Sequence, residues 1–558
     1  MISRLIPAAA FLCLSAASAA FAQTTHYVAP LGANLTGTAD GSEANPWPSV
    51  NTALNDAQGG DTILLMDGSH GALEVKNRNY TSPIEIRSAV GRRAQVTHIS
   101  ISEISQGLAV RNLLVMPVNL STAPSWLVLA DDTTSQVIFD NLEVFGGGES
   151  SRDYLKWNIS DWNAAKNGVR LEGSESQVLN SHLWGVEFGI TTKGQRAQVI
   201  NNIIRGFGAD GMRGFGTNST FKGNAVIDCV DISDNHDDGF QSFTSSGSID
   251  GLILDGNTFI EWSADSSHPL RGQMQGIGLF DGFYDNMIIK NNVVAVSQYH
   301  GIAVYGGRNI EISNNTVVHN DGLGVKYPWI GVFKHKNGTP SSNVLVANNI
   351  ANKMSGSTWP EYNVVYTDNS VIFDPATVFE DIANFDYHPK VGSGFVDTGN
   401  ANHAPPFDIA GNARPSGNGP DRGAYEVVGS SSGGGSDGGS TDTGSGSGTS
   451  SGDGSSDGGT SGGGGGSTDG STGDGTSGDG GETGGGSTDT GSGDGSSDGG
   501  TSDGDGTPDD GSTDGDTSGG FTDGTDEGPI VDDSNGRGNN NGGGAKWAVP
   551  PGQGKRNR

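Results

Sequence analysis

The sequence predicts an all-β solenoid, in which one short unit winds repeatedly around a shared core. A glycine followed by an apolar residue recurs seven times, as Gly168-Val169, Gly189-Ile190, Gly211-Met212, Gly239-Phe240, Gly276-Ile277, Gly301-Ile302 and Gly331-Val332. Successive glycines are 21, 22, 28, 37, 25 and 30 residues apart, which indicates a fixed unit with loops of variable length. A single coil has no opposite face on which to bury its apolar side chains, so only stacked coils can share a core.

A second short phrase, built on asparagine, follows each of the first six glycine pairs. Its residues are Asn180, Asn201-Asn202, Gly223-Asn224, Gly256-Asn257, Asn291-Asn292 and Asn314-Asn315, and weaker copies stand at Asn112 and Asn141. We expect the glycines to supply turns with positive φ, and the asparagines to stack from coil to coil, each bonding its neighbour's backbone amide. Both sets are therefore interpreted as scaffold.

The chain divides into five segments. Residues 1–22 have the basic start, short apolar run and small-residue end of a secretory signal. Residues 23–60 form an N-terminal cap, in which Ser49 is expected to begin a short helix that covers the open end of the core. The solenoid follows over residues 61–428. An acidic Gly/Ser/Asp-rich linker, expected to be disordered, spans 429–534, and a short basic tail spans 535–558.

Composition limits the classes of partner. Of the net charge of −33, the linker contributes 22 acidic residues and no Lys or Arg, and the part before residue 429 holds 42 acidic and 26 basic residues. A basic face for nucleic acid is therefore not expected. No stretch is long and apolar enough for a transmembrane segment. Cys229, the only cysteine after the signal, is expected to be a buried structural thiol. We expect a monomer that is secreted or periplasmic.

The repeat pattern resembles the right-handed parallel β-helix superfamily, the pectin-lyase-like secreted carbohydrate-active proteins. Near the domain end, the segments 386–387, 396–399, 408–414 and 421–426 resemble the closing segment of bacterial β-helix repeat proteins. This resemblance implies the fold over residues 27–428. It leaves the chemistry open, because the same scaffold carries lyases, hydrolases, epimerases and adhesive proteins.

Strand alternation predicts one functional face. If the residue after each glycine points inward, the second and fourth residues point outward. The second positions are Arg170, Thr191, Arg213, Gln241, Gly278, Ala303 and Phe333, and the fourth are Glu172, Lys193, Phe215, Phe243, Phe280, Tyr305 and His335. This polar column beside an aromatic one is a candidate glycan surface, although the rings can also simply stack on one another.

The residues just before the glycines are expected to line the rim of this face. Stacked coils would bring Asp210, Asp238, Gln275 and His300 into one column, with His236 and Asp237 beside them. Such clustering of titratable groups is typical of active sites, although a polar turn is the structural alternative. Arg271, in the longest loop, is expected to wall the site and contact substrate.

Two mechanisms fit this cluster. In elimination or epimerisation at a uronic acid, His236 or His300 would be the base and Arg213 the carboxylate partner. Asp210, Asp237 and Asp238 would be Ca²⁺ ligands or proton relays. In glycoside hydrolysis, Asp210 with Asp237 or Asp238 would flank the scissile bond.

The cluster also resembles known centres in part. The pair His236 and Asp237 is similar to the His-Asp centres of β-helix alginate epimerases, but Asn235 stands where proline is usual. Asp237-Asp238 and His300-Gly301 resemble β-helix polygalacturonases, in which glycine rather than Tyr299 normally precedes the histidine. We therefore expect an exported lyase or epimerase-like enzyme acting on an acidic polysaccharide, with a glycoside hydrolase or a non-catalytic adhesive protein as alternatives.

Overall fold

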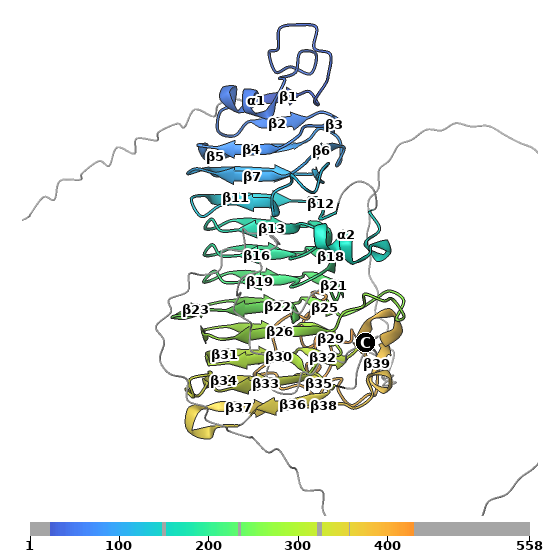
Figure 1. The fold of residues 1–558 in the computed structure, drawn as a ribbon. Helices are drawn as coiled ribbons and strands as arrows, with labels where there is room; N and C mark the ends of the chain where they lie inside the picture. Colours follow the sequence, from blue (N-terminus) through green and yellow to red (C-terminus); the bar gives the residue numbers. More distant parts are fainter. Residues whose placement is uncertain (1–22, 148–151, 233–235, 321–325, 357, 429–558) are drawn as a thin grey trace, which may run out of the picture. The chain divides into compact units, whose positions relative to one another are not determined.

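The computed structural model describes residues 23–147, 152–232, 236–320, 326–356 and 358–428. These residues form three long parallel sheets that together make a right-handed parallel β-helix, as the sequence predicts (Figure 1). Each coil passes through sheet 1, then sheet 2, then sheet 3, and returns to sheet 1 one rung further along. The predicted signal, linker and basic tail lie outside the described residues.

The sheets are defined by their strands. Sheet 1 contains the glycine phrases and consists of β4 (Leu73–Lys76), β7 (Ile99–Ser102), β10 (Trp126–Ala130), β13 (Asn167–Leu171), β16 (Ile190–Thr192), β19 (Met212–Gly214), β22 (Asp237–Phe243), β26 (Met274–Phe280), β30 (His300–Tyr305), β33 (Trp329–Phe333) and β36 (Lys353–Gly356). Sheet 2 consists of β1 (Thr25–Val28), β2 (Thr62–Leu65), β5 (Asn79–Ser88), β8 (Gln106–Arg111), β11 (Ser135–Asp140), β14 (Gln177–Leu179), β17 (Gln198–Ile200), β20 (Thr220–Lys222), β24 (Ile253–Asp255), β28 (Ile288–Lys290), β31 (Gly307–Ser313), β34 (Ser342–Ala347) and β37 (Val364–Thr367). In the same sheet, β27 (Phe283–Asp285) also pairs with β31, and β23 (Ser248–Asp250) pairs with β27. Sheet 3 consists of β3 (Gly68–Ser69), β6 (Ala94–Val96), β9 (Leu114–Val115), β12 (Glu143–Phe145), β15 (His182–Val186), β18 (Ile203–Phe207), β21 (Ala225–Cys229), β25 (Thr258–Ile260), β29 (Val293–Val296), β32 (Thr316–His319), β35 (Ile350–Ala351) and β38 (Ser370–Val371).

Short helices occur at the ends and in the loops. They are α1 (Val50–Asp56), η1 (Tyr154–Lys156), α2 (Ile159–Ala164), η2 (Pro360–Tyr362), η3 (Pro375–Thr377) and η4 (Ile382–Asn384). The predicted cap helix is confirmed as α1. Its first turn is capped because the Ser49 hydroxyl accepts a hydrogen bond from the Thr52 amide. Ala53 and Leu54 are buried and α1 packs on β1, β2 and β4, so the helix closes the first coil.

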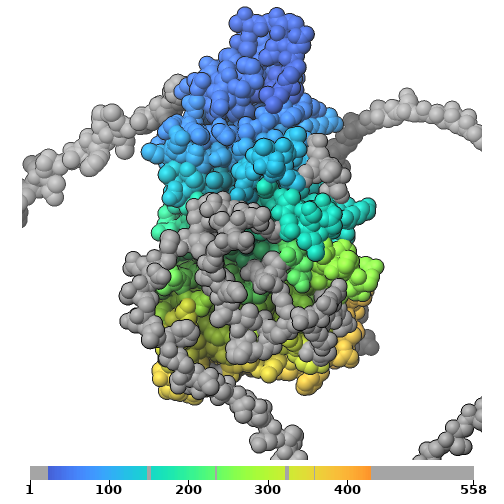
Figure 2. Space-filling view, in the orientation of Figure 1, coloured from blue at the N-terminus to red at the C-terminus, as the bar shows by residue number. Residues whose placement is uncertain are grey.

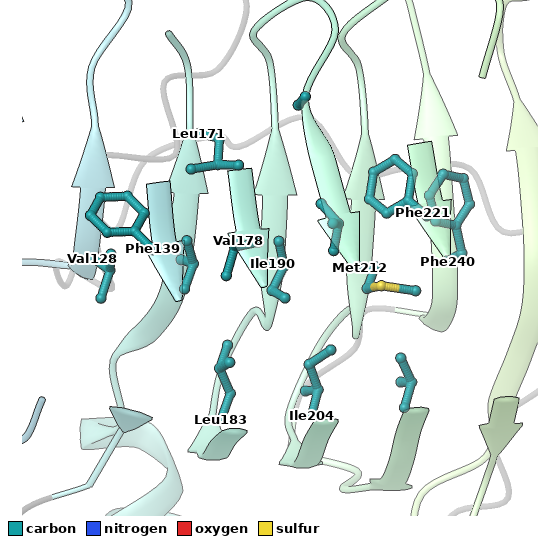
Figure 3. Packing of buried hydrophobic residues seen from close by; sticks show 14 of the residues in the cluster. Val128, Phe139, Leu171, Val178, Leu183, Ile190, Ile204, Met212, Phe221 and Phe240 are labelled. Carbon is teal, nitrogen blue, oxygen red and sulfur yellow. The ribbon is translucent and has the colours of Figure 1, made fainter. Parts of the chain in front are cut away.

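The core lies between the three sheets and runs the length of the stack (Figure 3). The inward direction predicted for the residue after each glycine is confirmed in all seven copies, where Val169, Ile190, Met212, Phe240, Ile277, Ile302 and Val332 are fully buried. Each such side chain contributes about 1.5–3 kcal/mol when removed from water. Cys229 is a buried free thiol, as predicted.

The repeat glycines have a different role from the one predicted. They do not have positive φ; the reason for glycine is close approach at the corner between sheets 3 and 1. A Cβ on Gly239 would lie 2.6 Å from Cδ1 of Phe259, and one on Gly189 would lie 2.2 Å from the carbonyl oxygen of Gly211. A side chain here would push the coils apart.

The asparagine stack is confirmed. Along the turn between sheets 2 and 3, the amide N–H of each asparagine donates to the side-chain oxygen of the next, through Asn202, Asn224, Asn257, Asn292, Asn315, Asn349 and Asn369. The Nδ2 of Asn257 also donates to the carbonyl of Phe221, at 2.9 Å. The ladder therefore satisfies buried backbone groups that a turn would otherwise leave unpaired.

We expect Asn257→Ala to lower the free energy of unfolding by roughly 3 kcal/mol, because it leaves the buried Asn224 amide without its acceptor and removes the Nδ2 bonds to the Phe221 carbonyl and to Oδ1 of Asn292. Asn286→Gly is the control. Asn286 is exposed and has a φ of 54°, which glycine adopts freely, so that change should stay within about 0.5 kcal/mol. Chemical denaturation measures both; equal losses would contradict this account of the ladder.

The seventh glycine copy is shifted relative to the prediction. Ile302 pairs with Ile330 rather than with Val332, and an irregularity in β30 between His300 and Ile302 absorbs the extra residue. The second and fourth positions of this coil are therefore Gly331 and Phe333, where Phe333 and His335 were expected. A shift of two residues keeps the inward and outward faces unchanged, so the alternation of the sequence does not reveal it.

The closing segment folds back along the outer face of sheet 3. Its side chains Phe379, Tyr387 and Ala424 pack against residues of that sheet such as Val293 and Ile350. The buried guanidinium of Arg414 donates to the carbonyls of the same segment and pairs with Glu426 at 3.1 Å. In the space-filling view the closing segment lies beside the last coils (Figure 2).

Candidate active site

The predicted rim column is present at the start of the sheet 1 strands. Asp238 pairs in register with Gln275 on β22 and β26, and the Asp238 amide donates to Oδ1 of Asp210 at 3.1 Å. Nδ1 of His300, the first residue of β30, is hydrogen-bonded to Oε1 of Gln275. Four successive coils therefore bring these side chains together where the chain enters sheet 1. The repeat glycine that follows each of them keeps the corner tight.

Asp238 organises the centre of the column. It is fully buried, and its Oδ2 accepts hydrogen bonds from Nε2 of Gln241 and from Nδ1 of His236, both at 2.8 Å. Gln241, predicted to contact substrate, thus holds the carboxylate from the polar column of β22. The two contacts fix the orientation of the His236 ring.

His236 is a basic and accessible imidazole. Its hydrogen bond to Asp238 raises the pKa of His236 to about 9, against the opposing effect of burial. The charges of Asp210 and Asp281 act in the same direction. Its side chain is 41% exposed, and because Nδ1 is bonded to Asp238, Nε2 is the nitrogen left to face a ligand. The ring edge contacts Phe280, with centroids 6.0 Å apart.

The three aspartates lie in a region that disfavours negative charge. Burial raises the pKa of Asp210, Asp237 and Asp238. The charge of Asp238 adds to the effect at Asp210, while that of Arg213 opposes it. Among the residues that the structure describes, Oδ1 of Asp237 and Oδ1 of Asp238 are buried without a hydrogen-bond partner, and Oδ2 of Asp237 accepts from the Cys229 thiol at 3.4 Å. Such carboxyl groups are suited to hold and pass on a proton near neutral pH.

The fit of this cluster to Ca²⁺ is poor. Within the described part of the chain, no group of three or more His, Cys, Asp or Glu side chains is arranged to hold a metal ion. The role of calcium stays a prediction, and no step proposed below runs through it.

His300 differs from His236 in its surroundings. Burial, followed by the charges of His236 and Lys326, lowers the pKa of His300 to about 3. Its ring is enclosed by Tyr299 and Trp329, at centroid distances of 4.2 and 4.9 Å. His300 is therefore neutral at physiological pH and a weaker base than His236, although the sequence predicts either histidine as the base.

The two predicted arginines have separate places. Nε of Arg213 donates to Oγ1 of Thr191 at 3.1 Å, and its guanidinium lies 3.8 Å from the ring centroid of Phe188. It is close enough to Asp210 to affect the pKa of that carboxyl. Arg271 instead forms a buried ion pair with Glu261, with 3.6 Å between Nη2 and Oε1. The structure thus gives Arg271 a structural partner, and its contact with substrate remains a prediction.

The aromatic column is formed as predicted up to its last member. Phe215 and Phe243 lie 4.8 Å apart, and Phe280 and Tyr305 lie 5.9 Å apart, between ring centroids. Phe333, not His335, continues the column, 4.9 Å from Tyr305. His335 stacks on Phe283 instead. The rings contact one another, which supports the stacking alternative, and they are only partly buried, which leaves them open to a sugar.

Two residues beside the rim column, Trp329 and Lys326, were not predicted from the sequence. Trp329 pairs in register with His300 and takes the rim position that Ile330 was expected to hold. Lys326 lies near the same histidine and contributes to its low pKa. The available signal was the segment Lys326-Tyr327-Pro328-Trp329, which directly precedes an apolar run. The seventh glycine pair, Gly331-Val332, instead favoured the register in which Ile330 holds the rim position.

Comparisons with known proteins agree on the fold. Residues 156–402 match the protein family described as "Right handed beta helix region". No curated protein sequence matches the chain. Among solved structures, a pectate lyase is similar with 17% identity and a TM-score of 0.41, over 72% of this chain and 96% of that one. An alginate lyase is similar with 12% identity and a TM-score of 0.35, over 62% of this chain and 51% of that one.

A third similar structure is a lacto-N-biosidase from Eubacterium ramulus, with 13% identity and a TM-score of 0.36, over 62% of this chain and 68% of that one. None of these three structures bears on the activity of this chain. Its three parallel sheets and stacked asparagine turn show the fold of a right-handed parallel β-helix, and residues 156–402 match the family model of that name.

Proposed function

We propose that this chain is an exported enzyme that acts on a uronate-containing polysaccharide by proton abstraction, as a lyase or an epimerase. The single observation that carries the proposal is the hydrogen bond between Asp238 and His236, which orients an accessible, basic imidazole. Asp210 and Arg213 lie close to the pair, and the partly exposed aromatic column runs beside it. A base, a cation and proton-holding carboxyls are what this chemistry requires.

In this reaction, Nε2 of His236 takes the proton from the carbon next to the sugar carboxylate. Arg213 pairs with that carboxylate and stabilises the negative charge that develops on it. In elimination, the electron pair forms a carbon–carbon double bond and the glycosidic C–O bond breaks. The departing oxygen takes a proton from the Asp210–Asp238 pair. In epimerisation, the same carbon instead receives a proton on its opposite face, and no bond of the polymer is cut.

The purified protein should be incubated with polymers of galacturonate, mannuronate, guluronate and glucuronate, with and without a chelator. A lyase is expected to generate unsaturated sugar ends, seen by their ultraviolet absorbance, on at least one polymer. An epimerase changes the uronate composition without new ends. If neither product forms on any of these polymers, the proposal is wrong. A loss of activity with chelator would establish the calcium requirement.

A glycoside hydrolase is the second candidate, and the raised pKa of Asp210 favours it. Burial, reinforced by the charge of Asp238, keeps a proton on this carboxyl, as a general acid requires. The same incubation separates the two candidates, because hydrolysis releases reducing ends without unsaturation. A non-catalytic glycan-binding protein would yield no product at all, and its binding would depend on Phe243 rather than on His236.

Export is proposed from the sequence of residues 1–22, which has the pattern of a cleaved secretory signal. Within the described part of the chain, no helix is long and apolar enough to span a membrane. Comparing the N-terminus of the purified protein with the sequence tests the signal; a mature chain should begin near Gln23.

A further inference from the structure

An aromatic and polar group lies beyond His300, and the proposed reaction does not use it. Tyr299 and Trp329 lie on neighbouring rungs with ring centroids 6.1 Å apart and planes inclined at 35°. Trp329 is mostly buried, whereas Tyr299 is partly exposed. Trp329 therefore packs near the ring of Tyr299, part of which remains exposed to solvent.

Three polar side chains from successive loops accompany these rings. Nζ of Lys326 donates to Oε1 of Gln298 at 3.0 Å, and Nε2 of Gln298 donates to Oε1 of Gln273 at 2.8 Å. The Lys326 ammonium also lies 5.5 Å from the ring centroid of Tyr299. The lysine is thus held next to the aromatic ring by an amide chain.

No carboxylate of the described residues compensates the charge of Lys326. Its contacts are a neutral amide and a ring, and no Asp or Glu of the described residues forms an ion pair with it. Lys222 and Lys336, by contrast, pair with Asp255 and Asp281. A partly exposed cation without a carboxylate, set beside an exposed ring, is a suitable place for an anionic ligand.

We propose that Tyr299, Gln298 and Lys326 form a sugar-binding subsite for a uronate residue of the polysaccharide, separate from the reacting position at His236. The apolar face of the sugar ring packs on Tyr299 and its carboxylate pairs with Lys326. The substrate class rests on the proposed function; the site itself rests on the contacts above.

The position of the subsite sets a length requirement. Tyr299 directly precedes β30 and Lys326 precedes β33, while His236 precedes β22. Strands in a sheet are about 4.8 Å apart, so two to three rungs separate the two positions by roughly 10–15 Å. A single sugar cannot reach both, and the subsite should therefore act only on oligomers several sugars long.

Binding of uronate hexamers, of the four sugars named above, should be measured by calorimetry with the full-length protein, Lys326→Met and Lys222→Met. The Kd of the hexamer that binds wild type is expected to rise about tenfold in Lys326→Met, the loss of one charge-assisted hydrogen bond. It should not change in Lys222→Met, where the replaced lysine lies exposed on sheet 2. The methyl ester of the same hexamer, which lacks the charge, should bind both variants equally, and Tyr299→Ala should weaken both ligands.

The outcomes separate the subsite from the reaction. If Lys326→Met binds the hexamer as wild type does, or loses acid and ester equally, the subsite is wrong. If wild type binds none of the four hexamers, it is wrong as well. If the protein turns over no polymer but Lys326→Met still binds the hexamer more weakly than wild type, the result supports the subsite and overturns the proposed function.

Discussion

His236→Ala is expected to lower kcat by about 10³-fold on the uronate polymer that the protein converts, because a positioned base contributes roughly 10²–10⁴-fold to proton transfer. Substrate binding should change little, since the proton is removed only in the transition state. The His236 side chain is 41% exposed, and buried Asp238 keeps its hydrogen bond from Gln241 when the imidazole is removed, so the thermal unfolding midpoint should stay close to that of wild type. Initial rates under saturating substrate, together with a melting curve, measure both quantities.

The chain provides a matched control for this variant in the closing segment. His388 is paired with Asp386 at 2.6 Å, with the same two-residue spacing as His236 and Asp238, and its side chain is 42% exposed. It packs on Tyr425 and belongs to no part of the rim column. His388→Ala should therefore retain wild-type kcat. Equal activity of His236→Ala and His388→Ala would remove His236 from the mechanism.

Asp238→Asn is expected to shift the pH profile of kcat/KM by two units or more toward acid. In wild type, only neutral His236 can accept a proton, and Asp238 holds the pKa of this imidazole at about 9. On a substrate for which removal of the carbon-bound proton limits the rate, the later proton donation by the Asp210–Asp238 pair does not enter kcat/KM. Its logarithm should thus rise with a slope of one up to about pH 9 and then level off. Asparagine removes the charged hydrogen-bond acceptor, and burial then favours the neutral ring. The pKa of His236 should fall to near or below its ordinary value of about 6.5.

The plateau value of kcat/KM should be lower in Asp238→Asn than in wild type, because a less basic imidazole removes a proton more slowly. Asp386→Asn is the corresponding control and should leave the profile unchanged. A profile of Asp238→Asn that still rises toward pH 9 would mean that another group is the base. A wild-type rate that falls through pH 9 would instead assign protonated His236 to an acid role.

Much of the site could be predicted from the sequence, because a solenoid converts a repeat interval into a distance. Asp210, Asp238, Gln275 and His300 each precede a repeat glycine, and stacking alone brings them into contact. The last coil could not be placed in this way. There, the strand is shifted by two residues after the irregularity in β30 and by one before it, which puts Trp329 in the column. The inward and outward pattern of the strand is identical in the predicted and observed registers.

The roles of the two histidines could not be predicted, because a pKa depends on burial and partners rather than on residue type. His236 meets a buried carboxylate and becomes strongly basic, whereas His300 meets an amide and aromatic rings and loses its basicity. Arg271 was predicted to contact substrate on its place in a long loop. Its partner Glu261 lies at the start of the same connection, and the irregular loop between them gives no spacing from which the ion pair could be predicted.

The sequence by itself determined the three-sheet coil, the inward apolar residues, the asparagine ladder and the face on which titratable groups gather. These features repeat in coil after coil. Each copy favours the same local structure, and the copies together favour a single fold. Only the tertiary structure decided why glycine is required at the corner, where the last coil is registered, and which histidine is basic. Each of these depends on side-chain contacts and burial at one position of the folded chain, and such features leave no periodic trace in the sequence.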